Sequence, residues 1–229
     1  QSTKFVRNPD WWRTKVYGTP VYLDAVEFFP ITDASSAVAG LIGGDLDSVG
    51  TTNVNAILTV RDKGAAYTRI ENGQGEESFA MMNTAAAPFD DIRVRQALTF
   101  ATPRKNYIEF AGAGILQAAD TMFTPDQIWD NTAITQEGDT PDKAAPLIKA
   151  YCADVPANCT NGRVNIDFQY AGPSVSQDQV ADILTAGWGD YFNVNRKVVL
   201  QDDLITNVVL GAYQIVAWRS FGAPDPAPD

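Results

Sequence analysis

Histidine is absent from this sequence of 229 residues, and cysteine occurs only twice. Without histidine the chain offers no imidazole for a catalytic triad, for general base catalysis near neutral pH or for metal binding. Two cysteines are too few to complete a zinc site made of thiolates alone. We therefore predict no catalytic residue of these classes, no metal site and no bound cofactor.

Positive charge is also scarce, because 17 Lys and Arg residues stand against 28 Asp and Glu residues, for a net charge of −11. Nucleic acids and anionic membrane surfaces both require a basic face on their partner. No stretch approaches the roughly 18 consecutive apolar residues of a membrane span. The first residues also lack the basic and apolar regions of a signal peptide. We predict no nucleic-acid partner and no membrane insertion by this segment.

What is present is an ordinary globular composition and one very informative run, PFDDIRVRQALTFATPRKNYIE, at residues 88–109. Asp90 or Asp91 can cap the start of a helix, where acidic groups also favour the helix dipole. An apolar stripe then recurs at the helical spacing i, i+3, i+4 and i+7. The stripe consists of Val94, Ala97, Leu98 and Ala101. The run therefore predicts a capped, amphipathic helix.

The last third of the sequence predicts alternating strands and helices. Its segments are strand 164–170, helix 180–191, strand 194–200, helix 202–210 and strand 213–218. This order is typical of an α/β fold with a mostly parallel sheet. Thr140 and Pro141 open a further helix, which Pro146 is expected to kink or shorten.

The earlier part of the chain has weaker signals. We expect a strand within 22–31, a helix over 34–41 capped by Asp33, and a turn at 72–73 between two strands. Residues 112–140 carry no sustained period and predict a long, partly ordered excursion.

The two cysteines, Cys152 and Cys159, are seven positions apart and flank a loop that contains Pro156 and Asn158. This spacing suits a short disulfide loop, and a disulfide indicates an oxidising compartment outside the cytoplasm. Two unpaired buried thiols are the alternative interpretation.

Three ordered motifs resemble the extracellular solute-binding proteins of ABC importers, family 5. The first is NPDWW at 8–12 followed by YLDAVEFFPITDASSAVAGLIGGDLDSV at 22–49. The second is MMNTAAAPFDDIRVRQALTFA at 81–101, and the third is YQIVAWRSFGAPDPAPD at 213–229. The resemblance covers essentially the whole chain.

The resemblance implies a periplasmic-binding-protein-like α/β fold of class II, also called cluster C. It implies that residues 1–50 are the last part of lobe I and that 51–229 are most of lobe II, with a crossing at 48–52. It also implies a fragment of an importer's receptor, in the periplasm or outside the cell. Such a receptor captures a small solute, such as an oligopeptide or a sugar, and delivers it to an ABC permease.

The resemblance places ligand contacts at Asn83, Trp218, Arg219 and Phe221. Family members that bind peptides carry an acidic residue three positions after the tryptophan, where this chain has Phe221. The stretch AGPSVSQDQ after the 164–170 strand lacks the arginine found in dipeptide binders. An aromatic pair beside a guanidinium suits a sugar, a planar ring or an acidic group. A core position for Trp218 and a surface ion pair for Arg219 are the simpler interpretations.

Two further hypotheses belong to other classes. One is a stand-alone interaction domain derived from such a receptor. The other is a hydrolase that uses paired carboxylates, either Asp45 with Asp47 or Asp90 with Asp91. Adjacent acids at a helix start are usually caps, which disfavours the hydrolase.

Overall fold

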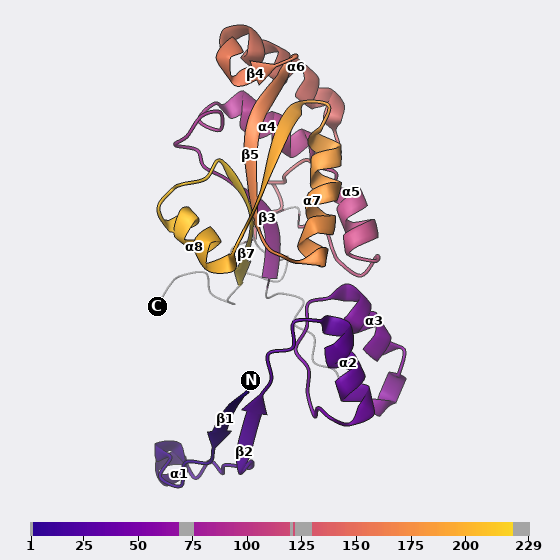
Figure 1. The fold of residues 1–229 in the computed structure, drawn as a ribbon, viewed down its shortest axis with the longest axis vertical. Helices are drawn as coiled ribbons and strands as arrows, with labels where there is room; N and C mark the ends of the chain where they lie inside the picture. Colours follow the sequence, from indigo (N-terminus) through magenta and orange to yellow (C-terminus); the bar gives the residue numbers. More distant parts are fainter. Residues whose placement is uncertain (1, 69–75, 120, 122–129, 222–229) are drawn as a thin grey trace. The chain divides into compact units, whose positions relative to one another are not determined.

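The computed structural model describes residues 2–68, 76–119, 121 and 130–221 (Figure 1). The contacts along the chain divide it into two compact units, residues 1–67 and 68–229. Residues 48–52, the predicted crossing between lobes, connect two helices of the first unit. The assignment of 1–50 and 51–229 to two lobes remains a prediction.

The first unit combines a two-stranded ribbon with a pair of helices. Strands β1 (Thr3–Val6) and β2 (Ala25–Phe28) pair antiparallel, and helix α1 (Trp12–Tyr17) lies in their connection. Helices α2 (Ala34–Gly43) and α3 (Val54–Arg61) follow, and the 3₁₀ turn Gly64–Ala66 comes next. The side chain of Asp33 accepts a hydrogen bond from the Ser36 N–H at 2.7 Å, so the predicted cap of α2 is confirmed.

Apolar side chains of the ribbon are open to solvent. Every residue of β1 and β2 is exposed. The exposed large side chains include Phe5, Val6, Tyr22, Leu23, Phe28 and Phe29. An isolated two-stranded ribbon is only marginally stable in water, and here the ring contact between Phe5 and Phe28 joins its two strands.

The second unit is built on a five-stranded sheet around β5. Its strands are β3 (Glu76–Met82), β4 (Cys159–Thr160), β5 (Arg163–Ala171), β6 (Phe192–Val199) and β7 (Ile215–Phe221). Strand β6 runs parallel to β5 along its whole length, and β7 runs parallel to β5 with Phe168 opposite Ile215. Strands β3 and β4 pair antiparallel with β7 and β5. The predicted α/β fold is confirmed, and its sheet is mixed, with two parallel and two antiparallel pairings.

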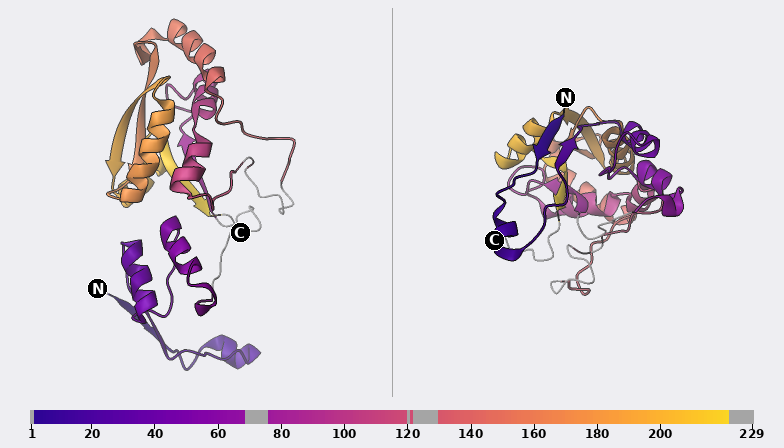
Figure 2. Two further views of the ribbon diagram at one scale, coloured as in Figure 1. Left: turned by 90° about the vertical axis from the view of Figure 1, so that its right-hand side faces the viewer. Right: turned by 90° about the horizontal axis from the view of Figure 1, so that it is seen from below.

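Helices cover this sheet on both faces. Helices α4 (Ile92–Ala101), α6 (Pro141–Asp154) and α7 (Val175–Trp188) pack over the face where β5 presents its apolar side chains. Figure 2 (left) shows α4 and α7 on the same side of the strands. Helix α8 (Gln201–Val209) lies on the other face, where its Asn207 side chain donates to Gln169 Oε1. Both faces of β5 have helix contacts because successive residues of a strand point to opposite faces: Phe168 faces the core, and Gln169 faces α8.

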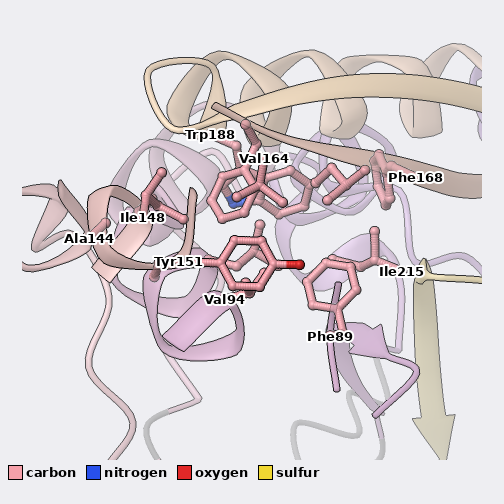
Figure 3. Packing of buried hydrophobic residues seen from close by; sticks show 14 of the residues in the cluster. Phe89, Val94, Ala144, Ile148, Tyr151, Val164, Phe168, Trp188 and Ile215 are labelled. Carbon is pink, nitrogen blue, oxygen red and sulfur yellow. The ribbon is translucent and has the colours of Figure 1, made fainter. Parts of the chain in front are cut away.

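The core of the second unit lies between the sheet and these three helices (Figure 3). Val164, Ile166, Phe168 and Tyr170 of β5 are all at most 2% exposed. Trp188 ends α7 inside this core, with its ring centroid 5.3 Å from that of Phe168. Its indole N–H donates to Thr102 Oγ1 at 3.0 Å, which satisfies the one polar group of the buried ring.

Helix α4 has the predicted apolar stripe. Val94, Ala97, Leu98 and Ala101 are all at most 4% exposed, so this prediction is confirmed. Asp91 is the residue that caps the helix, because its carboxylate accepts from the Arg93 N–H at 2.8 Å.

The expected effect of Pro146 was wrong as to length, because α6 runs without interruption from Pro141 to Asp154. Proline removes the bond that residue 146 would donate to the carbonyl of residue 142, in the first turn. Burial of Ala144, Ile148 and Tyr151 outweighs that single loss. The end of α6 is joined to β4 by the disulfide between Cys152 and Cys159, whose Cα atoms lie 5.7 Å apart.

Two sequence expectations fall partly outside the described residues. The predicted turn at 72–73 lies there, and the strand expected after it is β3, which pairs with β7. Of residues 112–140, the described ones form turns and irregular backbone. In the described part of the chain, no helix combines the length and apolarity that a membrane crossing requires.

Candidate ligand-binding site

The order of strands in the second unit creates a switch point at the end of β5. From β5 the chain passes through α7 over one face to β6, and from β6 it passes through α8 over the other face to β7. Strands β6 and β7 therefore flank β5 on opposite sides. In open α/β sheets, ligands bind in the crevice at the carboxyl ends of the strands where the order reverses in this way. The candidate site is this edge, at Ala171 of β5, Val199 of β6 and the end of β7.

The sheet face that carries α8 divides into a polar half and an apolar half. Strands β5 and β6 form the polar half, and their side chains pair across the parallel register. Asn193 donates to Asn165 at 2.9 Å, and Asn195 donates to Asp167 at 2.7 Å. Lys197 contributes an ammonium group 2.6 Å from the second carboxylate oxygen of Asp167.

Asp167 stays ionised in this arrangement. Burial disfavours its charge, but hydrogen bonds from Lys197 and Asn195 outweigh that effect and hold the pKa of Asp167 below its usual value. An open depression of about 800 Å³ adjoins these residues, with Arg163, Asn165, Asp167, Asn193 and Asn195 in its lining. The depression includes the beginnings of β5 and β6, so it is not the switch-point edge.

Strands β3 and β7 form the apolar half of the same face. Phe79 lies directly opposite Trp218, and Met81 lies directly opposite Val216. Val216 is in turn opposite Gln169, which contacts α8, so these four side chains project on the α8 side. Phe79 is 41% exposed and Val216 is fully buried. The open end of this apolar half is therefore the aromatic pair of Phe79 and Trp218.

The predicted contacts from β7 do not all project the same way. Trp218 is half-buried on the α8 side, whereas Arg219 is exposed and projects from the opposite face. Phe221 is the last residue of β7, and its side chain lies outside the described part. Trp218 and Arg219 thus approach the switch-point edge from its two faces.

Asn83 is engaged in hydrogen bonds within the protein. Its side-chain amide donates to the carbonyls of Gly211 and Tyr213, both at 3.0 Å, and its Oδ1 accepts from the Ala85 N–H at 3.1 Å. Its backbone N–H donates to the Gln214 carbonyl at 2.8 Å. Asn83 therefore holds the end of β3 against the loop that precedes β7.

Gln214 and Gln169 extend this clasp to β5. Gln214 accepts from the Asp167 N–H at 2.7 Å and donates to the Ala87 carbonyl at 3.0 Å, and Gln169 donates to the Ala212 carbonyl at 3.0 Å. Sequence reasoning did not find these amides. For Gln169 a usable signal was present, because polar residues alternate with apolar ones in VNIDFQY.

The two carboxylate pairs considered for hydrolysis, Asp45 with Asp47 and Asp90 with Asp91, lie in different units of the chain. Asp91 caps α4, and Arg93 bridges it to Asp154 with contacts of 2.7 and 2.6 Å. The hydrogen bond from Arg93 lowers the pKa of Asp91, which makes this carboxyl a poor proton donor. Asp45 and Asp47 lie in the loop after α2, in the other unit. No group of three or more Cys, Asp or Glu side chains in the described residues could hold a metal ion.

An α/β unit with crossovers on both faces and a switch point hosts many functions, so the fold alone does not assign one. The family model "Bacterial extracellular solute-binding proteins, family 5 Middle" matches residues 1–229. The chain therefore belongs to this family of bacterial solute-binding proteins, and the predicted family is confirmed.

Individual relatives agree with this assignment. The chain is 25% identical to the nickel-binding periplasmic protein of Escherichia coli K12 over 97% of this chain and 43% of that protein. It is 28% identical to the heme-binding protein A of Haemophilus influenzae over 65% of this chain and 26% of that protein. The chain therefore spans less than half the length of these curated relatives.

A solved structure of similar fold is the ABC transporter-associated periplasmic binding protein DppA of Helicobacter pylori, in complex with the peptide STSA. The TM-score is 0.83 and the identity 21%, over 99% of this chain and 42% of that one. This likeness confirms the periplasmic-binding-protein fold.

Proposed function

We propose that this chain is the middle part of the extracytoplasmic receptor of an ABC importer, which captures a small solute between two lobes and delivers it to a permease in the membrane. The observation that carries the proposal is the family match over the whole chain. Two relatives are named for nickel and heme, and a solved structure of similar fold holds a peptide, so an oligopeptide and a metal chelate are the first candidate solutes. A sugar of similar size stays a candidate from the sequence analysis.

The exposed ribbon of the first unit supports the proposal of a partial lobe. Phe5, Val6, Phe28 and Phe29 are each at least half exposed. The relatives possess more than twice the matched length, so chain outside the matched part is available to cover such a face. The assignment of 1–50 to lobe I and 51–229 to lobe II follows the family resemblance and is part of this proposal, whereas the compact units of the structure meet between residues 67 and 68.

The switch-point edge is the proposed contribution of lobe II to the ligand site. Trp218 and Arg219 supply an aromatic ring and a guanidinium there, and we retain Phe221 as a neighbour at the end of β7. Asn83 supports the site indirectly, by fixing the start of β7. Location in the periplasm or outside the cell follows the family and the disulfide.

Affinity of the isolated chain should be weak. A receptor with micromolar affinity has about −8 kcal/mol of binding free energy, and half of the contacts would give only about millimolar affinity. Loss of enclosure weakens binding further. The direction of this effect is independent of the solute.

The test is an NMR titration of the 229-residue chain with three probes: the tetrapeptide STSA, a nickel–EDTA chelate and a linear trisaccharide. We expect one probe to shift the indole N–H resonance of Trp218 with roughly millimolar affinity. Replacement Arg219→Ala should weaken that binding. Its matched control is Arg163→Ala, which removes the same charge from the opposite end of the parallel strands. Absence of any shift with all three probes, or an equal effect of both replacements, would contradict the proposal.

A further inference from the structure

The two halves of the α8-side face differ in what they leave available for a ligand. On β5 and β6 the side chains of Asn165, Asn193, Asn195, Asp167 and Lys197 already bond to one another. On β3 and β7, Phe79 and Trp218 present apolar rings, and the one polar group of the two side chains is the indole N–H of Trp218. The apolar half is thus the part of this face that gains most from being covered.

The register fixes the geometry of the pair. Phe79 and Trp218 are directly opposite each other in an antiparallel pair, so their Cβ atoms are about 4.5–5.5 Å apart and both rings stand on one face. Val216, fully buried, lies two residues before Trp218 on the same face and, with Met81 opposite it, forms the floor beside the rings. Phe79 is 41% exposed, so the pair forms an open apolar surface rather than part of the core.

The pair of Phe79 and Trp218 lies at the switch-point edge of the sheet. Trp218 is two residues beyond Val216, which is opposite Gln169, so the pair is level with the end of β5 at Ala171. This is the switch-point edge at which ligands of open α/β sheets bind. Aromatic walls in such places hold flat, apolar groups by stacking and edge-to-face contact.

We propose that Phe79, paired with Trp218, forms an apolar subsite that selects solutes with a flat or aromatic group. The inference rests on the proposed function, because it assigns the specificity of that same site. Met81 adapts the floor of the subsite to groups of different shape, because its thioether side chain is flexible and polarisable. The hydrogen bonds of Asn83 and Gln214 hold the end of β3 beside the start of β7, so the subsite is preformed.

The experiment uses two neutral probes that differ only in the ring, N-acetyl-phenylalaninamide and N-acetyl-alaninamide. Each is titrated into the 229-residue chain while the Trp218 indole resonance is observed. We expect the ring-bearing probe alone to shift it. Replacement Phe79→Leu should weaken binding by roughly two- to twelvefold, the range that aromatic contacts contribute. Phe79→Tyr keeps the ring and should retain the affinity of the original chain.

The control variant is Phe110→Ala, which removes a ring that is 69% exposed in the π-helical turn Tyr107–Ala111. It should leave binding unchanged. Equal affinity of Phe79→Leu and the original chain would overturn the inference, and so would equal shifts by both probes. If the ring-bearing probe binds as expected but STSA, nickel–EDTA and the trisaccharide all fail, the subsite stands and the proposed capture of these solutes fails.

Discussion

Asn83 is the residue for which a ligand role and a structural role make the most different predictions. The side chain makes three hydrogen bonds, two as donor to the carbonyls of Gly211 and Tyr213 and one as acceptor from Ala85. Each such bond contributes about 1 kcal/mol net. Because this region is partly solvated, water replaces some of them in the variant. We expect Asn83→Ala to lower the free energy of unfolding by roughly 2 kcal/mol.

Urea denaturation followed by far-ultraviolet circular dichroism measures this change. With a slope of about 2–3 kcal/mol per molar urea, the midpoint of the second unit should fall by somewhat less than 1 M, with the slope unchanged. Asn83→Asp should be worse than Asn83→Ala, because a carboxylate would face two carbonyl oxygens that it cannot donate to.

The matched control is Asn165→Ala, in the exposed ladder between β5 and β6, where the side chain donates to Thr160 Oγ1 and accepts from Asn193. Exposed bonds of this kind are largely replaced by water, so we expect a loss below about 1 kcal/mol. A loss for Asn83→Ala within 0.5 kcal/mol of zero, on the order of typical surface substitutions, would refute the structural role of its amide.

Two further predictions concern the region where α4 meets α6. Thiol titration of the denatured, non-reduced chain should find no free thiol at Cys152 or Cys159, and two free thiols would contradict this. Replacing both cysteines with serine should lower the free energy of unfolding by about 2.5 kcal/mol, as the entropy of the closed loop indicates. Unchanged stability would contradict this second prediction. Because Arg93 lowers the pKa of Asp91 in the folded state, the stability from this pair is complete above the ordinary carboxyl pKa of 3.8 and is lost as the pH falls through the lowered value. The difference in unfolding free energy between the original chain and Asp91→Asn should therefore shrink as the pH is lowered below about 4, and a constant difference would show that the charge of Asp91 is not what stabilises.

Much of the second unit was predictable because local signals and packing agree there. The stripe of α4 and the alternation in β5 each bury one set of side chains, so period alone identifies the core face. The ends of elements were less predictable. The sequence predicted a kinked or shortened helix at Pro146. A proline at the sixth position removes only the bond to residue 142, and burial of Ala144 and Ile148 depends on contacts distant in sequence.

The candidate site was only partly predictable because it depends on strand register. Trp218 and Arg219 are neighbours in sequence, yet they project from opposite faces of β7, so adjacency in the motif does not mean one shared wall. The partner of Trp218 on its own face is Phe79, almost 140 positions away. Asn83, which the motif groups with the ligand contacts, also bonds to the segment before β7 and so holds the end of β3 against it. Its three side-chain hydrogen bonds give Asn83 a structural role beside the ligand contact that the resemblance predicts.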